Sequence, residues 1–243
     1  MHAKFCDGTG NVKRFLGGIR KVEDRGSAEA CWLAAIGEPG NGKSRTLMWY
    51  ATQKKGVYIR AKAGWNTSWM LSEIIAVLMG SEASGSNQQK FLVALRELAR
   101  RGCPLIIDEA WNMLGDARLL ETLRDFSDTL ENLIIIGGEN RVTDRLKARY
   151  PQIASRITAT ADFKLATSGD VRTLCDTLCE VTIADDLVTR ILSDSGGYTR
   201  EIKNCIATCE KVGKRNGKTV TAKDMEGQEL CADRRGGLPE PLR

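Results

Sequence analysis

The sequence of 243 residues contains one histidine, His2, and no long hydrophobic run. Its longest apolar stretches, such as Leu133–Ile136 and Ile74–Met79, are far shorter than the roughly 20 residues that a membrane-spanning helix needs. The first six residues are not followed by the apolar core of a secretory signal. We therefore expect a cytoplasmic protein without a membrane partner.

The charge and the cysteine content of the chain exclude few further classes of function. The chain has 36 basic and 31 acidic residues, a net charge of +5, which permits contact with nucleic acid without requiring it. Its eight cysteines include the pairs Cys175/Cys179 and Cys205/Cys209, each spaced to share one face of a helix. Zinc sites favour Cys-x-x-Cys spacing and often include histidine. We therefore predict that these cysteines are small buried apolar residues in a reducing compartment.

Residues 37–44 form a complete phosphate-binding loop, or P-loop, after the apolar run 32–36. Glycines allow the backbone to curl so that successive N–H groups point at phosphate oxygens. Lys43 is expected to reach the β- and γ-phosphates, and Ser44 to offer its hydroxyl to Mg²⁺, at the positive end of a helix over 45–54. ATP and Mg²⁺ are thus the predicted cofactors. The predicted contacts are Gly37, Glu38, Pro39, Gly40, Asn41, Gly42, Lys43, Ser44 and Arg45.

A second motif, the apolar run 105–107 followed by Asp108 and Glu109, is typical of a Walker B strand. Asp108 would hold Mg²⁺ through water, and Glu109 would polarise the water that attacks the γ-phosphate. The alternative is an ordinary strand whose acidic end is solvated. The P-loop upstream favours the catalytic interpretation.

Strands and helices alternate along the first two thirds of the chain, which predicts a parallel sheet covered on both faces. The expected strands are 32–36, 57–61, 105–107, 133–137 and 156–163. The expected helices are 11–25 before the first strand, and 45–54, 67–79, 88–101, 117–130 and 141–149 between the strands.

After residue 166 only helices are expected, at 170–180, 184–193, 199–215 and 222–231. The predicted fold class is α/β: a P-loop nucleotide domain with a five-stranded parallel sheet at 1–165, and a small helical domain at 166–232. The tail 233–243 is rich in glycine and proline and is expected to be flexible.

The order of these motifs resembles the AAA+ ATPases, including a strand that ends in Gly137-Gly138-Glu139-Asn140 and a helical part with Gly197-Tyr198-Thr199-Arg200. More narrowly, Asn11-Val12, the helix ending Glu23-Asp24-Arg25-Gly26 and the P-loop are similar to the transposition ATPase Mu B of phage Mu and its relatives of the TnsC type. The resemblance extends from about residue 11 to 230 and implies that the helical part is an AAA+ lid. The chain is expected to lack the extra N-terminal DNA-binding domain of Mu B.

The resemblance also implies roles for single residues. Asn140 matches sensor 1, which helps to position water, and Arg200 matches sensor 2, which touches the phosphates from the lid. Arg156 matches the arginine finger that reaches a neighbouring subunit's nucleotide, and Arg149 is its rival. The alternatives are a turn residue for Asn140 and solvated or capping arginines for the others.

For DNA, the stretch 60–69 is the most suggestive, because it supplies cations and hydrogen-bond donors at a helix N-terminus and contains no acidic residue. Lys62, Asn66 and Thr67 are the predicted backbone contacts, with little sequence preference. The alternative is that Asn66 or Thr67 caps a helix while Trp65 and Trp69 lie in the core.

The function implied by the resemblance is an ATP-hydrolysing AAA+ regulator that oligomerises on double-stranded DNA as a helical filament and selects or activates target DNA for a transposase. Its partners would be duplex DNA, copies of itself and the transposase. The alternatives are a helicase loader of the IstB/DnaC type and a nucleotide switch that binds ATP without hydrolysing it.

Overall fold

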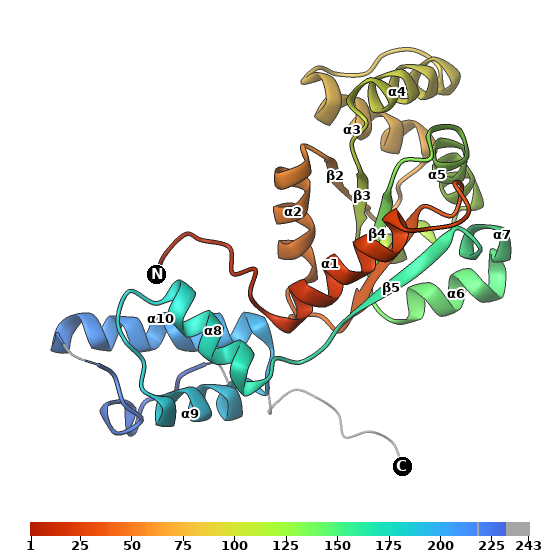
Figure 1. The fold of residues 1–243 in the computed structure, drawn as a ribbon. Helices are drawn as coiled ribbons and strands as arrows, with labels where there is room; N and C mark the ends of the chain where they lie inside the picture. The colour runs from red at the N-terminus through yellow and green to blue at the C-terminus, as the bar shows by residue number, and fades with distance from the viewer. Residues whose placement is uncertain (218, 232–243) are drawn as a thin grey trace. The chain divides into compact units, whose positions relative to one another are not determined.

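The computed structural model describes residues 1–217 and 219–231, which form two compact units (Figure 1). One unit is Asn11–Lys164, and the other joins Met1–Gly10 to the chain from Leu165 onward. The sequence places the boundary one residue later and assigns residues 1–10 to the nucleotide domain, whereas the structure groups them with the helical unit. The predicted flexible tail, 233–243, lies outside the described residues.

The first unit contains a five-stranded parallel sheet with the strand order β2-β3-β4-β1-β5. The strands are β1 (Trp32–Gly37), β2 (Val57–Arg60), β3 (Leu105–Asp108), β4 (Ile134–Gly138) and β5 (Ile157–Phe163). Strands β1, β3 and β4 are buried at every position, as expected for apolar runs covered on both faces. The predicted α/β fold class is therefore confirmed.

Helices cover this sheet, and polar side chains at their N-termini set where several of them begin. Asn66 and Asp116 accept hydrogen bonds from the first turns of the helices that follow them, and Ser86 forms a reciprocal capping box with Gln89. The helices are α1 (Gly10–Glu23), α2 (Lys43–Lys54), α3 (Thr67–Met79), α4 (Asn87–Arg101), the short η1 (Ala110–Met113), α5 (Ala117–Leu130), α6 (Arg141–Arg149) and α7 (Pro151–Ala154).

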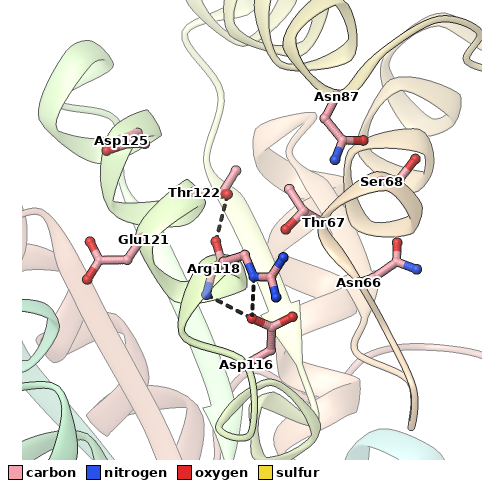
Figure 2. A pocket seen from close by; sticks show the side chains of 9 residues that line it. All are labelled: Asn66, Thr67, Ser68, Asn87, Asp116, Arg118, Glu121, Thr122 and Asp125. Carbon is pink, nitrogen blue, oxygen red and sulfur yellow. Dashed lines mark hydrogen bonds and ion pairs between the residues drawn. The ribbon is translucent and has the colours of Figure 1, made fainter.

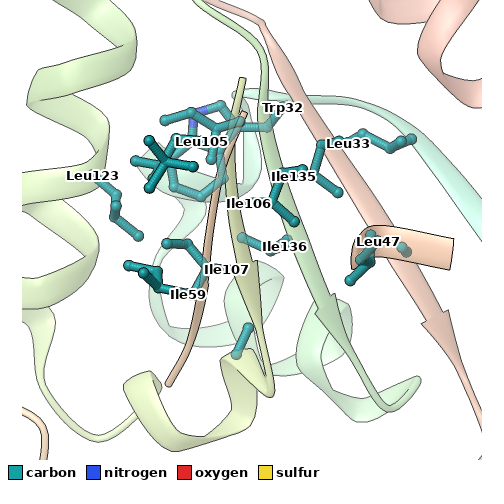
Figure 3. Close-up of a cluster of buried hydrophobic side chains, with 14 of the residues drawn as sticks. Trp32, Leu33, Leu47, Ile59, Leu105, Ile106, Ile107, Leu123, Ile135 and Ile136 are labelled. Atoms are coloured by element: carbon teal, nitrogen blue, oxygen red, sulfur yellow. The ribbon is translucent and has the colours of Figure 1, made fainter. Parts of the chain in front are cut away.

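The core of the first unit lies on the faces of the central strands (Figure 3). Trp32, Ile106 and Ile135 have no exposed surface, and Leu47 and Leu123 reach the sheet from α2 and α5. Burying a large apolar side chain contributes roughly 1.5–3 kcal/mol, so this cluster makes the sheet a rigid support. The loops at its edges are thereby held in place.

The second unit consists of α8 (Ser168–Leu178), α9 (Asp185–Ser195), α10 (Thr199–Asn216) and the short η2 (Lys223–Met225). The predicted helix at 222–231 is wrong, because only η2 forms there. Arg190 of α9 donates to the carbonyl oxygens of Met225 and Gln228 and so holds the segment after η2 in a non-helical path. Gly227, with a φ of 73°, then turns the chain away.

The core of the helical unit is rich in cysteine, as predicted. Cys175, Cys179, Cys205 and Cys209 are all buried among aliphatic side chains, and all eight cysteines of the chain are free thiols. Burial raises the pKa of Cys175 and of Cys209 to about 12. Among the described residues, no helix is both long and apolar enough to span a membrane.

The burial of the thiols predicts their reactivity. The thiolate is the reactive form, and the raised pKa values keep thiols such as Cys175 and Cys209 protonated at pH 8, while burial hinders access of a reagent. We expect an aromatic disulfide reagent to modify at most Cys231, the one cysteine that is not buried, in the native protein. All eight thiols should react after unfolding in guanidinium. Rapid native modification of several thiols would show that the helical core is open.

Candidate nucleotide-binding site

The P-loop connects β1 to α2 through backbone conformations that favour glycine. Gly37, Gly40 and Gly42 have φ values of 147°, 93° and 91°, in the region that side chains disfavour. Gly42 is the N-cap residue of α2 and makes no side-chain cap. The first N–H groups of α2 therefore remain available to an anion.

Lys43, the first residue of α2, folds back onto the loop. Its Nζ donates to the carbonyl oxygens of Gly37 at 2.5 Å and Glu38 at 2.9 Å. Burial lowers the pKa of Lys43, and the negative charges of Asp108 and Glu109 oppose that shift. Those two carboxylates are thus near enough to act on the lysine. The loop, its lysine and the Ser44 hydroxyl together form a donor set that fits a nucleotide phosphate with Mg²⁺.

Asp108 ends β3 at the same sheet edge, because β1, β4 and β3 are adjacent parallel strands. Its side chain is 1% exposed, and its two oxygens accept hydrogen bonds from the Glu109 backbone N–H at 2.9 Å and the Tyr58 hydroxyl at 2.8 Å. Burial and the Asp108 charge raise the pKa of Tyr58. The carboxylate is therefore held in one orientation, and Tyr58 is a site residue that sequence reasoning missed.

Glu109 has a φ of 55°, which is uncommon for a residue with a side chain and costs roughly 1–3 kcal/mol. Its half-exposed carboxylate lies 3.6 Å from the guanidinium of Arg60, the last residue of β2. Such exposed ion pairs are worth about 1 kcal/mol or less. Arg60, which the sequence interpretation assigned only to the DNA stretch, thus competes weakly for the predicted catalytic carboxylate.

Asn140 lies just beyond the end of β4, between the P-loop and the β3 carboxylates. It is exposed, and although it is the N-cap residue of α6, its side chain makes no capping hydrogen bond. The predicted sensor position therefore has a side chain that is not used as a cap. The structure places the P-loop, Asp108, Glu109 and Asn140 at one edge of the sheet.

Arg156 lies at the edge of the sheet opposite the P-loop. It precedes β5, whose first residue pairs with the first residue of β1, so it is remote from the P-loop of its own chain. Its guanidinium binds both oxygens of Asp128, at 2.7 and 3.0 Å, and this interaction lowers the pKa of Asp128. Arg149, the rival candidate, is exposed at the end of α6. Arg200 is exposed in the first turn of α10, in the helical unit.

The predicted DNA contacts carry less unpaired positive charge than the sequence of residues 60–69 suggests. Lys62 forms an ion pair with Glu73, one helical turn beyond the stretch, and its Nζ lies 5.2 Å from the centre of the Trp69 ring. Asn66 caps α3, as the alternative interpretation predicts. Trp65 is buried, but Trp69 is 43% exposed and is not a core residue.

Asn66 and Thr67 also line a polar groove of about 540 Å³ between the starts of α3, α4 and α5 (Figure 2). The opposite wall carries three carboxylates and one cation, Arg118, which itself lies 3.8 Å from an oxygen of Asp116. Carboxylates repel phosphates. The groove thus disfavours a DNA backbone. The acidic lining residues are Asp116, Glu121 and Asp125.

Comparisons with known proteins agree with this geometry. Residues 29–146 match a family model described as an AAA domain. No curated protein matches the sequence.

The fold matches solved AAA+ P-loop NTPase structures at low sequence identity. The Aeropyrum pernix ORC2 protein in ADPNP-ADP complexes has a TM-score of 0.68 at 15% identity, covering 92% of this chain and 68% of that one. Domain III of the Thermotoga maritima replication initiation protein DnaA has a TM-score of 0.58 at 14% identity, with 90% and 91% covered. The A. pernix ORC1 protein in complex with DNA has a TM-score of 0.55 at 14% identity, with 88% and 62% covered. The chain thus spans less than two thirds of ORC1.

The tight approach of Gly37 to β5 provides a test of the P-loop geometry. A Cβ on Gly37 would lie 2.3 Å from the carbonyl oxygen of Phe163, whereas a Cβ on Gly17, in α1, would meet no atom within 4 Å. We expect Gly37→Ala to lower the free energy of unfolding by about 2 kcal/mol or more. Gly17→Ala should raise it by roughly 0.5–1 kcal/mol. Urea unfolding measures both, and equal effects would contradict the observed loop conformation.

Proposed function

We propose that this protein binds ATP with Mg²⁺ and hydrolyses the γ-phosphate bond. The proposal rests on one observation: the P-loop and the Asp108–Glu109 pair occupy the same edge of the sheet, with Asn140 between them. The structural similarity to ORC2 in ADPNP-ADP complexes supports it.

Each residue has a separate task in this proposal. The P-loop N–H groups and Lys43 bind the phosphates, so Lys43 must leave the carbonyl oxygens of Gly37 and Glu38. Ser44 and Asp108 would hold Mg²⁺, which supplies charge neutralisation at the β- and γ-oxygens. Glu109 orients water, with help from Asn140. Arg200 would contact the phosphates from the lid.

Arg156 completes the site only from a second copy. Its place at the far edge of the sheet supports a role outside its own chain's P-loop, and the Asp128 carboxylate holds its guanidinium. Acting as a finger in a neighbour's site, it would make hydrolysis depend on assembly. Arg149 is the second candidate for this role, because it is exposed.

The separate roles of Lys43 and Glu109 predict different effects for their variants. Lys43→Ala should abolish ATP binding in calorimetry, because it removes the charge that meets the phosphates. Glu109→Gln should keep binding within about twofold and lower turnover by about a hundredfold or more. Wild-type turnover by Glu109→Gln would show that another group activates the water.

We further propose that the protein assembles on duplex DNA as a filament and selects target DNA for a transposase. The motif resemblance to Mu B and the TnsC type supports this role, and so does the similarity of the fold to ORC1 in complex with DNA. The contacts would address the DNA backbone. Affinity should therefore depend on salt more than on sequence.

The Lys62–Glu73 pair makes the DNA proposal testable in both directions. Lys62→Ala should weaken ATP-dependent binding to duplex DNA and reduce its salt dependence, because one cation is lost. Glu73→Gln should strengthen binding, because it frees Lys62 from its ion pair. Lys54→Ala, an exposed change at the end of α2, is the matched control. Fluorescence anisotropy over a salt series measures the affinity of all three for duplex DNA. Equal affinities would show that DNA binds another surface of the protein.

A further inference from the structure

Asn11, at the start of α1, uses its whole hydrogen-bonding capacity on three neighbours. Its side-chain oxygen accepts from the backbone N–H of Lys164 at 2.8 Å and from Arg14 at 2.6 Å. Its amide nitrogen donates to the carbonyl oxygens of Lys164 at 2.8 Å and of Asn41 at 3.2 Å. An asparagine has two donors and two acceptor positions, so the buried carboxamide is fully satisfied in one orientation.

The bond to Asn41 matters because Asn41 belongs to the P-loop. In a trans peptide the carbonyl of one residue and the N–H of the next point in opposite directions. Holding the Asn41 carbonyl toward Asn11 therefore makes the Gly42 N–H point away from Asn11. One of the two torsions that turn this peptide plane is φ of Gly42, which a glycine restricts little. Asn11 supplies the constraint that the glycine does not.

The other bonds join the P-loop to the end of β5. Asn11 pairs with both backbone groups of Lys164, as a neighbouring strand would, and the Asn41 amide donates to the carbonyl oxygen of Phe163 at 2.9 Å. The chain passes between the two units at residues 10–11 and 164–165, directly beside Asn11 and Lys164 in the sequence. Asn11 therefore bonds the P-loop to the last residue of the first unit.

We propose that Asn11 is a positioning residue of the nucleotide site, an inference that rests on the proposed ATP binding. It orients the peptide between Asn41 and Gly42 so that the Gly42 N–H faces the phosphates. Through Lys164 it also links phosphate binding to the order of the segment 163–165. By reciprocity, nucleotide that fixes the P-loop also stabilises this segment.

Nucleotide affinity tests the first part. We expect Asn11→Ala to weaken ADP and ATP binding about tenfold in calorimetry, because the Asn41 carbonyl loses its buried donor. Asn11→Asp has nearly the same shape but directs an oxygen at two carbonyl oxygens, and should weaken binding further. In turnover, KM should rise while kcat stays near the wild-type value. The matched control is Asn132→Ala, which removes a weak 3.5 Å contact to Leu98 at the other end of the sheet and should bind like wild type.

Hydrogen–deuterium exchange tests the second part without relying on activity. The Lys164 N–H is bonded to the Asn11 side chain, so Asn11→Ala should speed exchange in the peptide that contains Lys164. ATP should slow exchange there in the wild type and much less in the variant. If Asn11→Ala does not fold, as thermal unfolding would show, Asn11→Asp serves for the affinity measurement, and exchange at Lys164 is compared in the wild type with and without ATP.

The outcomes separate this inference from the proposed function. If the wild type binds no nucleotide, both are wrong. If the wild type binds ATP and the Asn11 variants bind it equally well, the positioning role is wrong while ATP binding stands. Weaker binding with unchanged exchange at Lys164 would overturn the link to the segment 163–165.

Discussion

The structure depends on one constraint: the backbone of the P-loop must present its N–H groups to the phosphates without a side chain in the way. Gly37 meets this constraint most sharply, since Phe163 of the neighbouring strand leaves no room for a Cβ. The parallel sheet then determines what else is near. Because β3 and β4 run in the same direction as β1, their carboxyl ends bring Asp108, Glu109 and Asn140 to the same edge.

Four cations at or near the proposed binding sites already have a partner within the protein. Lys43 binds the P-loop carbonyls, Arg60 lies near Glu109, and Lys62 pairs with Glu73. Arg156 is bound more firmly, by both oxygens of Asp128. Nucleotide, DNA or a second copy would therefore have to displace an internal partner. Exposed ion pairs contribute about 1 kcal/mol or less, so replacing an internal partner by a ligand costs little free energy where the side chains are solvated.

The proposed DNA surface shows how a linear stretch of sequence can mislead about charge. Residues 60–69 contain no acidic side chain, but the fold brings Glu73 onto Lys62 and places carboxylates of α5 across the groove from Asn66 and Thr67. A helical turn and a packing contact thus change the local electrostatics. The proposed DNA surface therefore has fewer unpaired cations than the sequence indicates.

Local sequence determined the features that depend on nearest neighbours. Apolar runs, glycines and capping residues gave the five strands, the P-loop and the bounds of α3 and α5, because each depends on contacts within a few residues. The same reasoning failed at 222–231, where Arg190 of another helix binds the carbonyl oxygens of Met225 and Gln228 on either side of the turn at Gly227.

Only the tertiary structure decided which distant groups meet. Tyr58 on Asp108, Arg60 near Glu109, and Asn11 joining the P-loop to Lys164 all span tens of residues. No periodicity or motif encodes such pairs, because they arise from strand order and from side chains that cross between elements. The sequence alone determined the chemistry of the site, while the folded chain determined how its groups are held.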